Sequence, residues 1–346
     1  FLPMEFVKLI TSYQNVKSTM EQLGVVTMHM ISTLKIVNLY FKRNEISRII
    51  DELHYNDLTE TSGSLERKNL QNKFHRKIRR LCMFFFHMGN CTSTILCATS
   101  LIHLIICKHE TVYQEFCSTV QPIVISTPIH IRSLIYSRWI ICAFQWMCMF
   151  LYGWQIVAHD TLFAAILIKI ACNIRILQMD FKNITAESDQ NITKMNYKMN
   201  QLTFQLQKLI RTCQCAANVF QYIILLQVLS SLFILITCLY VAASVPVFGI
   251  EFVFQLQYYL TVVTQLSMYC WFADEVTILF SQMPVSIYQN YWICGDQSFK
   301  RSMLINMIRM NKPIYFIIGT VAPLNINVLV YILRASYSYF AIIKNK

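Results

Sequence analysis

Histidine and cysteine are the residue types that could support catalysis or hold a metal, but their spacing in this chain favours neither. His29, His103 and His159 each stand alone in apolar segments, where packing or a helix interface is the simpler role. The sequence contains no Gly-rich phosphate loop, no G-x-S-x-G and no H-E-x-x-H. Since no convergent set of titratable residues can be assembled, we expect neither an enzyme nor a metal or other cofactor.

The 13 cysteines are scattered and imply no disulfide framework. The shortest spacing is Cys213-Gln-Cys215, and cysteines inside apolar runs behave as small hydrophobic residues. Cys107 and Cys117 flank a predicted outer loop and could form a disulfide, but spacing alone leaves their pairing open.

Polar residues inside apolar segments indicate a different kind of function, most of all in the last segment, Asn311 to Lys346. After Pro313 this segment is apolar for longer than the about 20 residues that cross a bilayer. It still contains Gly319, Pro323, Asn325, Asn327 and Arg334. Polar side chains at bilayer depth are costly unless they face protein or water, so we expect a helix that lines a cavity, a protein interface or a pore. The alternative is a helix buried among others with its polar groups hydrogen-bonded.

The composition is that of a membrane protein. Apolar residues make up 55% of the 346 residues and charged residues only 14%, whereas soluble domains carry about 25% charged residues. The mean hydropathy is +0.43. In a chain of this hydropathy, a net charge of +12 favours basic cytoplasmic loops over nucleic-acid binding.

The hydropathy pattern predicts an all-α, polytopic membrane protein with six spans. These spans cover residues 16–41, 81–107, 136–157, 217–243, 251–279 and 313–346. Residues 42–80, which are polar and basic, are expected to form a loop. Glu21, His29 and Lys35 interrupt the first span, so it should pack against other helices or a cavity, with Lys35 snorkelling to the nearer interface.

Helical periodicity continues beyond the third and fifth spans. It predicts amphipathic extensions within residues 159–216, interrupted by a polar segment at 180–200, and within residues 280–312. The chain therefore divides into spans at 1–158, extensions at 159–216, spans at 217–279, extensions at 280–312 and a last span at 313–346. The alternative is that the extensions lie on the bilayer surface, as basic amphipathic helices commonly do.

The distribution of Lys and Arg orients the spans. The loops after the first, third and fifth spans hold 21 of these residues, against seven on the other side, so those loops are expected in the cytoplasm and both ends of this sequence outside. The sequons Asn183-Ile-Thr185 and Asn191-Ile-Thr193 then lie in the cytoplasm and should carry no glycan.

Three sequence stretches resemble the insect odorant receptors. YILRASYSYF from Tyr331 resembles the C-terminal signature of that family, and LSMYCWFADEVT from Leu266, followed by Tyr288 and Trp292, resembles its sixth helix. RMNKPIYFIIGTVAPLN resembles the segment that enters its seventh helix. The family has seven helices, so the six spans correspond to helices two to seven, and the resemblance implies that the first helix is missing from this sequence.

The resemblance implies an odorant-gated, non-selective cation channel that works as a heterotetramer with the shared odorant co-receptor. The ligand would be a small volatile organic compound and the location the plasma membrane of an olfactory neuron dendrite, in contact with lipid and not with nucleic acid. The extensions at 160–181, 197–216, 280–292 and 298–310 would correspond to the cytoplasmic anchor bundle where family subunits meet.

The resemblance also places a ligand pocket in the outer halves of helices two, three, four and six. Helix faces there offer ten candidate odorant-binding residues: Met20, Gly24, Thr27, Ser100, His103, Tyr136, Ile140, Phe144, Tyr258 and Thr261. A mostly aromatic and aliphatic pocket with a few hydroxyls suits a small volatile molecule.

The family's gate is formed by apolar side chains at the end of helix seven. Matching on Tyr339-Phe340 assigns Ile342 to the gate, with Lys346 at the next turn and facing the outer mouth. A ring of apolar residues can block ions by dewetting. Arg334, about two turns deeper, is expected to be a buried charge satisfied by a salt bridge or a carbonyl group.

Other membrane proteins fit less well. A G-protein-coupled heptahelical receptor would carry Asp-Arg-Tyr and Asn-Pro-x-x-Tyr motifs, and neither is found at the relevant helices. A transporter would be favoured by an internal repeat, which is not evident. A gustatory receptor channel shares the architecture, but its C-terminal motif ends in Gln-Phe after Thr-Tyr, from which SYSYF departs.

Overall fold

The computed structural model describes residues 2–11, 16–59, 65–109, 135–187, 191–246, 249–312, 314–319 and 322–344. Its helices are α1 (Leu2–Thr11), α2 (Val16–Phe41), α3 (Arg43–Thr59), α4 (Leu65–His109), α6 (Ile135–Glu187), α7 (Ile192–Ser244), α8 (Ile250–Ser281), α9 (Met283–Tyr288), a 3₁₀ turn (Trp292–Cys294), α10 (Gln297–Met310) and α11 (Ile326–Lys344). A two-residue pair of strands, β1 (Ile317–Ile318) and β2 (Ala322–Pro323), precedes α11. The predicted all-α fold is confirmed.

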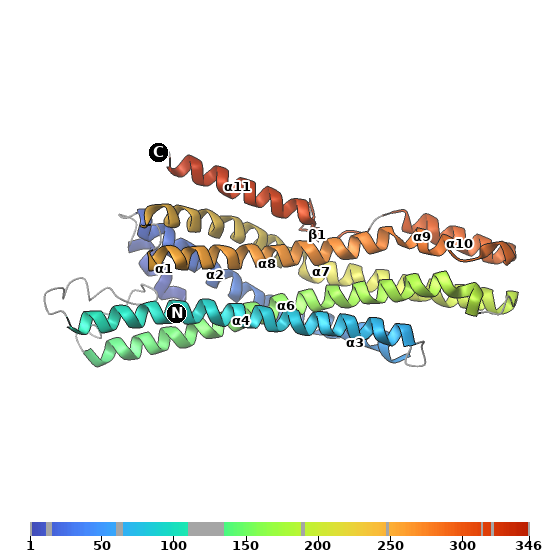
Figure 1. Ribbon diagram of the computed structural model, residues 1–346, viewed down its shortest axis with the longest axis horizontal. Coiled ribbons are helices and arrows are strands. Elements are labelled where there is room, and N and C mark those ends of the chain that lie inside the picture. Colours follow the sequence, from blue (N-terminus) through green and yellow to red (C-terminus); the bar gives the residue numbers. More distant parts are fainter. Residues whose placement is uncertain are drawn as a thin grey trace.

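The long helices form an elongated bundle. In Figure 1, α4, α6, α7 and α8 run along the long axis, α9 and α10 lie at one end, and α1, α2 and α11 lie in the other half. α6 and α7 have 53 residues each, which at about 1.5 Å per residue gives about 80 Å. Because a bilayer with its headgroups is about 40–45 Å thick, both helices must project well beyond it.

Four helices of the described residues are long and apolar enough to cross a membrane. They contain the segments Thr19–Phe41, Cys142–Thr185, Ile192–Ser244 and Ile326–Ile343. The other two predicted spans, 81–107 and 251–279, lie within α4 and α8, which are not among these four. All six predicted spans therefore contain helix, and their number in the bilayer stays a prediction.

Residues 42–80 are not the loop that we predicted. The described parts of this range form α3 and, from Leu65, the first turns of α4. Ile46, Ile49 and Leu53 on α3 and Phe74 on α4 are buried, at the spacing of an amphipathic helix face. The many charged residues of this segment made its helical spacing of apolar residues hard to recognise. In the structure these helices pack against α6, α7 and α8.

The polar segment predicted at 180–200 is also mostly helical. α6 continues to Glu187 and α7 begins at Ile192. The side chain of Asn191 caps α7 by accepting hydrogen bonds from the backbone N–H groups of Thr193 and Lys194, as expected for an N-cap asparagine.

The last segment is not one continuous helix from residue 313. Ile317 and Ile318 pair antiparallel with Pro323 and Ala322, and α11 begins only at Ile326. The turn between the strands uses Gly319 at φ 58°, a left-handed conformation in which other residues are strained. This hairpin is held on α7 by a hydrogen bond from Gly319 N to Gln221 O of 3.2 Å.

The substitution Gly319→Ala is expected to destabilise the protein by about 1–2 kcal/mol, since a left-handed residue with a Cβ atom costs about that much. The new Cβ would also lie 2.9 Å from Leu225 Cδ2. The matched control is Gly153→Ala on α6, whose Cβ would meet its nearest neighbour, Ser93 Oγ, at 3.5 Å; it should stabilise the helix, because alanine is a better helix former than glycine. Melting temperatures of the purified variants in detergent test this, and equal melting temperatures would contradict it.

Candidate functional site

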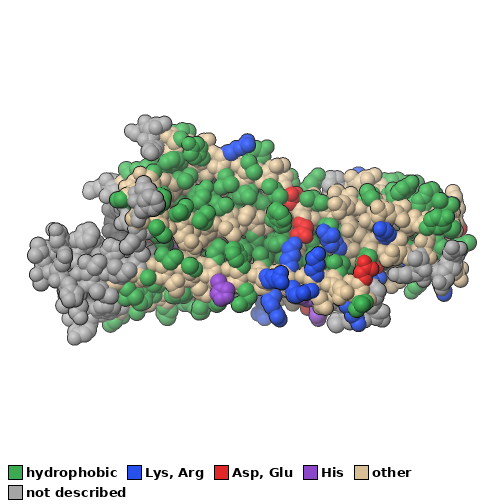
Figure 2. Space-filling view, in the orientation of Figure 1, with side chains coloured by type: hydrophobic (Ala, Val, Ile, Leu, Met, Phe, Trp, Pro, Cys, Tyr) green, Lys and Arg blue, Asp and Glu red, His purple; other side chains and the backbone are tan. Residues whose placement is uncertain are grey.

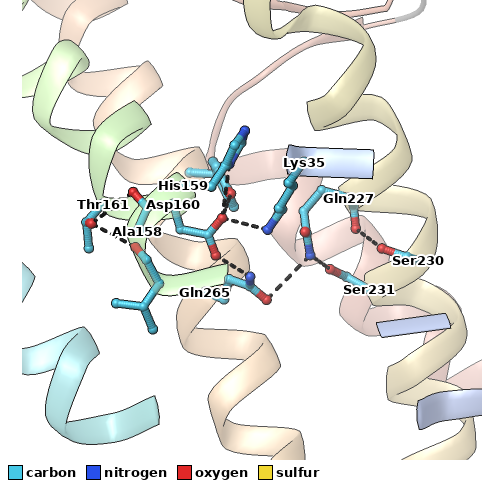
Figure 3. Close-up of polar contacts among 11 residues, drawn as sticks. Lys35, Ala158, His159, Asp160, Thr161, Gln227, Ser230, Ser231 and Gln265 are labelled. Atoms are coloured by element: carbon cyan, nitrogen blue, oxygen red, sulfur yellow. Dashed lines mark hydrogen bonds and ion pairs between the residues drawn. The ribbon is translucent and has the colours of Figure 1, made fainter. Parts of the chain in front are cut away.

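A buried polar cluster lies where α2, α6 and α8 meet. We define the Asp160 cluster as Lys35 on α2, His159 and Asp160 on α6 and Gln265 on α8 (Figure 3), together with Tyr269 on α8. Lys35 Nζ lies 2.6 Å from Asp160 Oδ1, and the Gln265 amide and the Tyr269 hydroxyl donate to the same carboxylate. His159 Nδ1 lies 3.4 Å from Asp160 Oδ1. One carboxylate thus joins three helices that are distant in sequence.

The cluster extends to α7 through amide and hydroxyl groups. Gln227 Nε2 lies 3.4 Å from Gln265 Oε1 and 3.1 Å from Ser231 Oγ. The Lys35 and Asp160 residues are each only 1% exposed. Charges removed from water to this extent are retained only when paired and hydrogen-bonded, so four helices are held in register by this set of contacts.

Lys35 therefore does not snorkel to an interface as we predicted. Its ammonium group is drawn inward because Asp160 lies across from it, 125 residues further along the chain. The prediction that the first span packs against other helices is confirmed, since α2 contacts α6 and α7. The available signal was that Lys35 and Asp160 carry opposite charges within apolar helices, and intramembrane charges commonly pair.

His29 belongs to a second buried contact. Its Nδ1 atom lies 2.8 Å from Glu5 Oε1, and its ring lies 4.5 Å from the ring of Tyr152, centroid to centroid. This contact fastens α1 to α2 and α6, and it gives His29 the interface role that its isolated position indicated.

Three predicted odorant-binding residues, Gly24, Tyr258 and Thr261, lie at contacts among α2, α4, α7 and α8. Gly24 lies against α7, since a Cβ there would be 2.8 Å from Thr237 Oγ1. The buried Tyr258 hydroxyl lies 2.9 Å from Met28 Sδ. Thr261 lies 3.4 Å from Thr92, hydroxyl to hydroxyl.

The other predicted odorant-binding residues differ in burial, and three of them cannot be compared. Met20 and Thr27 are half-buried, and the Thr27 hydroxyl donates to Leu23 O at 2.7 Å. Ile140 and Phe144 are 69% and 46% exposed, so their side chains are not enclosed within this chain. The side chains of Ser100, His103 and Tyr136 lie outside the described residues, as does Cys117, so the Cys107–Cys117 pairing stays open.

Two of the three predicted gate residues, Tyr339 and Ile342, lie on the exposed side of α11. α11 packs on α7 and α8, with Ile332 and Ser336 buried. Tyr339 and Ile342 are exposed, and Lys346 lies outside the described residues. Arg334 is also exposed in this single chain. The prediction that it is a buried charge is therefore wrong for the isolated chain.

The comparisons with known proteins agree on one family. The family model described as "7tm Odorant receptor" matches residues 15–337. The chain belongs to the insect odorant receptor family. The resemblance stated from the sequence motifs is thereby confirmed.

Individual relatives are distant from this receptor. Odorant receptor 10 of Aedes albopictus is 24% identical over 211 residues, which are 61% of this chain and 55% of the relative. Odorant receptor 46a, isoform B, of Drosophila melanogaster is 28% identical over 124 residues, 34% of this chain and 32% of the relative. The receptor chain thus spans about half or less of the length of the curated relatives that it matches.

The fold of the receptor is that of a solved family member. The structure of olfactory receptor OR5 from Machilis hrabei in complex with eugenol superimposes with a TM-score of 0.84, covering 99% of this chain and 85% of that chain. The sequence identity is 12%, so the similarity concerns the fold alone.

The end of the receptor formed by α9 and α10 is a well-packed helical bundle. Phe181 on α6, Met199 on α7 and Phe299 on α10 are fully buried. Asn306 on α10 donates to the Thr203 hydroxyl on α7 at 2.7 Å, and Asp296 caps α10 by accepting from Phe299 N at 2.9 Å. The predicted extensions are therefore packed against one another, at least through α6, α7, α9 and α10, and they do not lie separately on a surface.

Proposed function

We infer that this receptor is the odorant-binding subunit of a ligand-gated, non-selective cation channel that assembles with the odorant co-receptor. The observation that carries this inference is the fold match over 99% of the chain to an olfactory receptor solved with eugenol. The function also accounts for α11, which in the described part of the chain packs on α7 and α8 and leaves Tyr339 and Ile342 exposed. Such a helix is suited to line a pore shared with other subunits, with Ile342, Tyr339 and Lys346 near its outer mouth.

The odorant would bind on the outer side of the Asp160 cluster, near Gly24, Tyr258 and Thr261. Gly24 contacts Thr237 on α7, Thr261 contacts Thr92 on α4, and Tyr258 contacts Met28 on α2. A mostly apolar site with a few hydroxyls suits a small volatile molecule. Met20, Thr27, Ser100, His103, Tyr136, Ile140 and Phe144 remain candidates for the same pocket.

The bundle of α6, α7, α9 and α10 would be the cytoplasmic anchor where subunits meet. Its outer side carries exposed apolar residues on α9 and α10: Val285, Tyr288, Leu304, Ile305 and Ile308. Exposed apolar side chains that gather into a patch mark interaction sites, and we propose that these residues form such a patch. We place the receptor in the plasma membrane of an olfactory neuron dendrite.

The orientation is supported by the surface of α4. Figure 2 shows Lys and Arg side chains gathered midway along the molecule, beside a largely hydrophobic half. Along α4, exposed Lys73, Arg76 and Arg80 give way within about a turn to exposed Met83 and Phe84. Basic residues next to a span favour the cytoplasmic side, so α9 and α10 would lie in the cytoplasm.

Neither Asn183 nor Asn191 should carry a glycan if this orientation holds. Both sequons lie near the α6–α7 connection, at the end that we place in the cytoplasm. Digestion with a glycosidase should leave the mobility of the receptor on a gel unchanged. As a positive control, a sequon engineered into the segment between α4 and α6 should add a glycan, and a shift that depends on Asn183 or Asn191 would reverse the orientation.

Whole-cell current tests the channel function directly. Cells expressing the receptor, the co-receptor or both would receive puffs of eugenol and a panel of small volatile alcohols, esters and aldehydes. We expect a rapid cation current only when both chains are present, unaffected by inhibitors of G proteins. A second-messenger response without direct current would contradict the channel and favour a G-protein-coupled receptor, and a current from the receptor without the co-receptor would contradict the heteromer.

A further inference from the structure

The Asp160 cluster is connected to the entry of α11 by aromatic side chains. Phe163 lies one turn after Asp160 on α6 and is fully buried. Its ring lies 5.3 Å from the ring of Tyr269, a member of the cluster, and 6.4 Å from the ring of Phe316, centroid to centroid. Phe316 directly precedes β1, so a continuous set of packed rings runs from the cluster to the hairpin.

The hairpin fixes where α11 begins. Leu324 N donates to Phe316 O at 2.7 Å, which closes the base of the hairpin. One residue later Asn325 caps α11, its side chain accepting from Val328 N at 3.2 Å. These two hydrogen bonds connect the backbone of Phe316 to the first turn of α11. A displacement of Phe316 should therefore displace that turn as well.

On its other side, the cluster shares α8 with the proposed odorant pocket. Tyr258, Val262, Gln265 and Tyr269 are all buried, and their spacing places them on one face of α8. Tyr258 and Gln265 are about 10 Å apart along the axis. A shift of α8 caused by a ligand at Tyr258 must therefore move the donors of Asp160.

We propose that Asp160 and its donors are positioning residues that link the pocket helices α2 and α8 to the hairpin before α11, through Tyr269, Phe163 and Phe316. This inference rests on the proposed channel function. A buried carboxylate cannot lose its donors without a large penalty, so α2, α6 and α8 move together at this level. Close-packed interiors transmit such displacements, and a contiguous set of packed side chains is the physical means of coupling two sites.

Tyr269→Phe and Phe316→Leu test the link at its two ends. Tyr269→Phe removes one hydroxyl donor and keeps the ring against Phe163. Phe316→Leu replaces the ring that packs near Phe163 with a smaller side chain. Phe299→Leu is the matched control, because Phe299 is as buried as Phe316 but lies on α10 in the bundle of α6, α7, α9 and α10. Currents would be recorded with the co-receptor and normalised to surface expression, using the volatile that gives the largest wild-type response.

We expect Tyr269→Phe and Phe316→Leu each to raise the half-maximal odorant concentration at least threefold and to lower the maximal current, because pocket movement reaches α11 less efficiently. The double variant should be little worse than either single variant, since both interrupt one link, whereas Tyr269→Phe and Phe299→Leu should combine additively. Loss of surface expression without a change in the half-maximal concentration would indicate a structural role only and would overturn the proposal, as would additive effects of Tyr269→Phe and Phe316→Leu.

A wild-type receptor without odorant current would contradict the proposed function instead. In that case the same pairs of variants would be compared by the melting temperature of the purified receptor. Non-additive effects of Tyr269→Phe and Phe316→Leu, beside additive effects with Phe299→Leu, would support the link, and additive effects for both pairs would overturn it.

Discussion

Lys35→Met is expected to lower the free energy of unfolding by about 3–5 kcal/mol, the cost of leaving a buried charge without its partner. Asp160 would keep the Gln265 and Tyr269 donors but lose the ammonium group that lies 2.6 Å away. Because both residues are 1% exposed, water cannot replace the missing partner. We expect a large drop in the melting temperature of the purified receptor and little protein at the cell surface.

The double variant Lys35→Met, Asp160→Asn should recover most of this loss, since a buried ion pair can be replaced by neutral groups of similar volume at small cost. The matched control is Lys42→Met, which removes a partner of Glu45 at 2.8 Å in a pair whose side chains are 41% and 43% exposed. Exposed pairs contribute about 0–1 kcal/mol. A Lys35→Met receptor as stable as the control would mean that the two charges do not pair.

Phe299→Ala is expected to cost about 3–5 kcal/mol, as for other buried aromatic residues. Phe299 is 0% exposed and fills the space beside Gly295, where an added Cβ would lie 2.5 Å from its ring. The loss should detach α10 from α7 and so disrupt the proposed anchor. Melting of the purified chain and co-purification with the co-receptor should both decrease.

Leu304→Ala on the exposed side of α10 separates folding from assembly. Leu304 is 55% exposed, so its removal should leave the melting temperature of the isolated chain nearly unchanged and reduce only co-purification with the co-receptor. Full co-purification of Leu304→Ala would argue against this side of α10 as the subunit contact, while unchanged melting of Phe299→Ala would argue against the packing of α10 on the bundle.

Several elements of the receptor could be predicted from local sequence properties. Hydropathy and the 3.6-residue period are carried by neighbouring residues, so the helix at 16–41 and the amphipathic extensions at 160–181 and 197–216 could be predicted. The polar residues between 180 and 200 concealed that α6 continues to Glu187 and that α7 begins at Ile192. The motif YILRASYSYF identified the family for the same reason, because it is a contiguous stretch. Local charge also led to a wrong prediction. Because residues 42–80 are rich in basic side chains, we expected a loop and overlooked the apolar positions of α3 that are buried.

The candidate site depended on contacts that no local pattern records. That Lys35 faces Asp160, and that Gln265 and Tyr269 share the same carboxylate, follows from the rotation of α2, α6 and α8 about their axes, which is set by packing between helices. Likewise, the sequence shows Gly319 as an interruption of an apolar segment. Its left-handed conformation and its contact with α7 arise only when the hairpin packs on that helix. The sequence by itself determined that the chain is a helical membrane protein of the odorant receptor family. Only the tertiary structure decided which polar residues meet and where α11 begins, because a buried charge selects its partner by proximity in space.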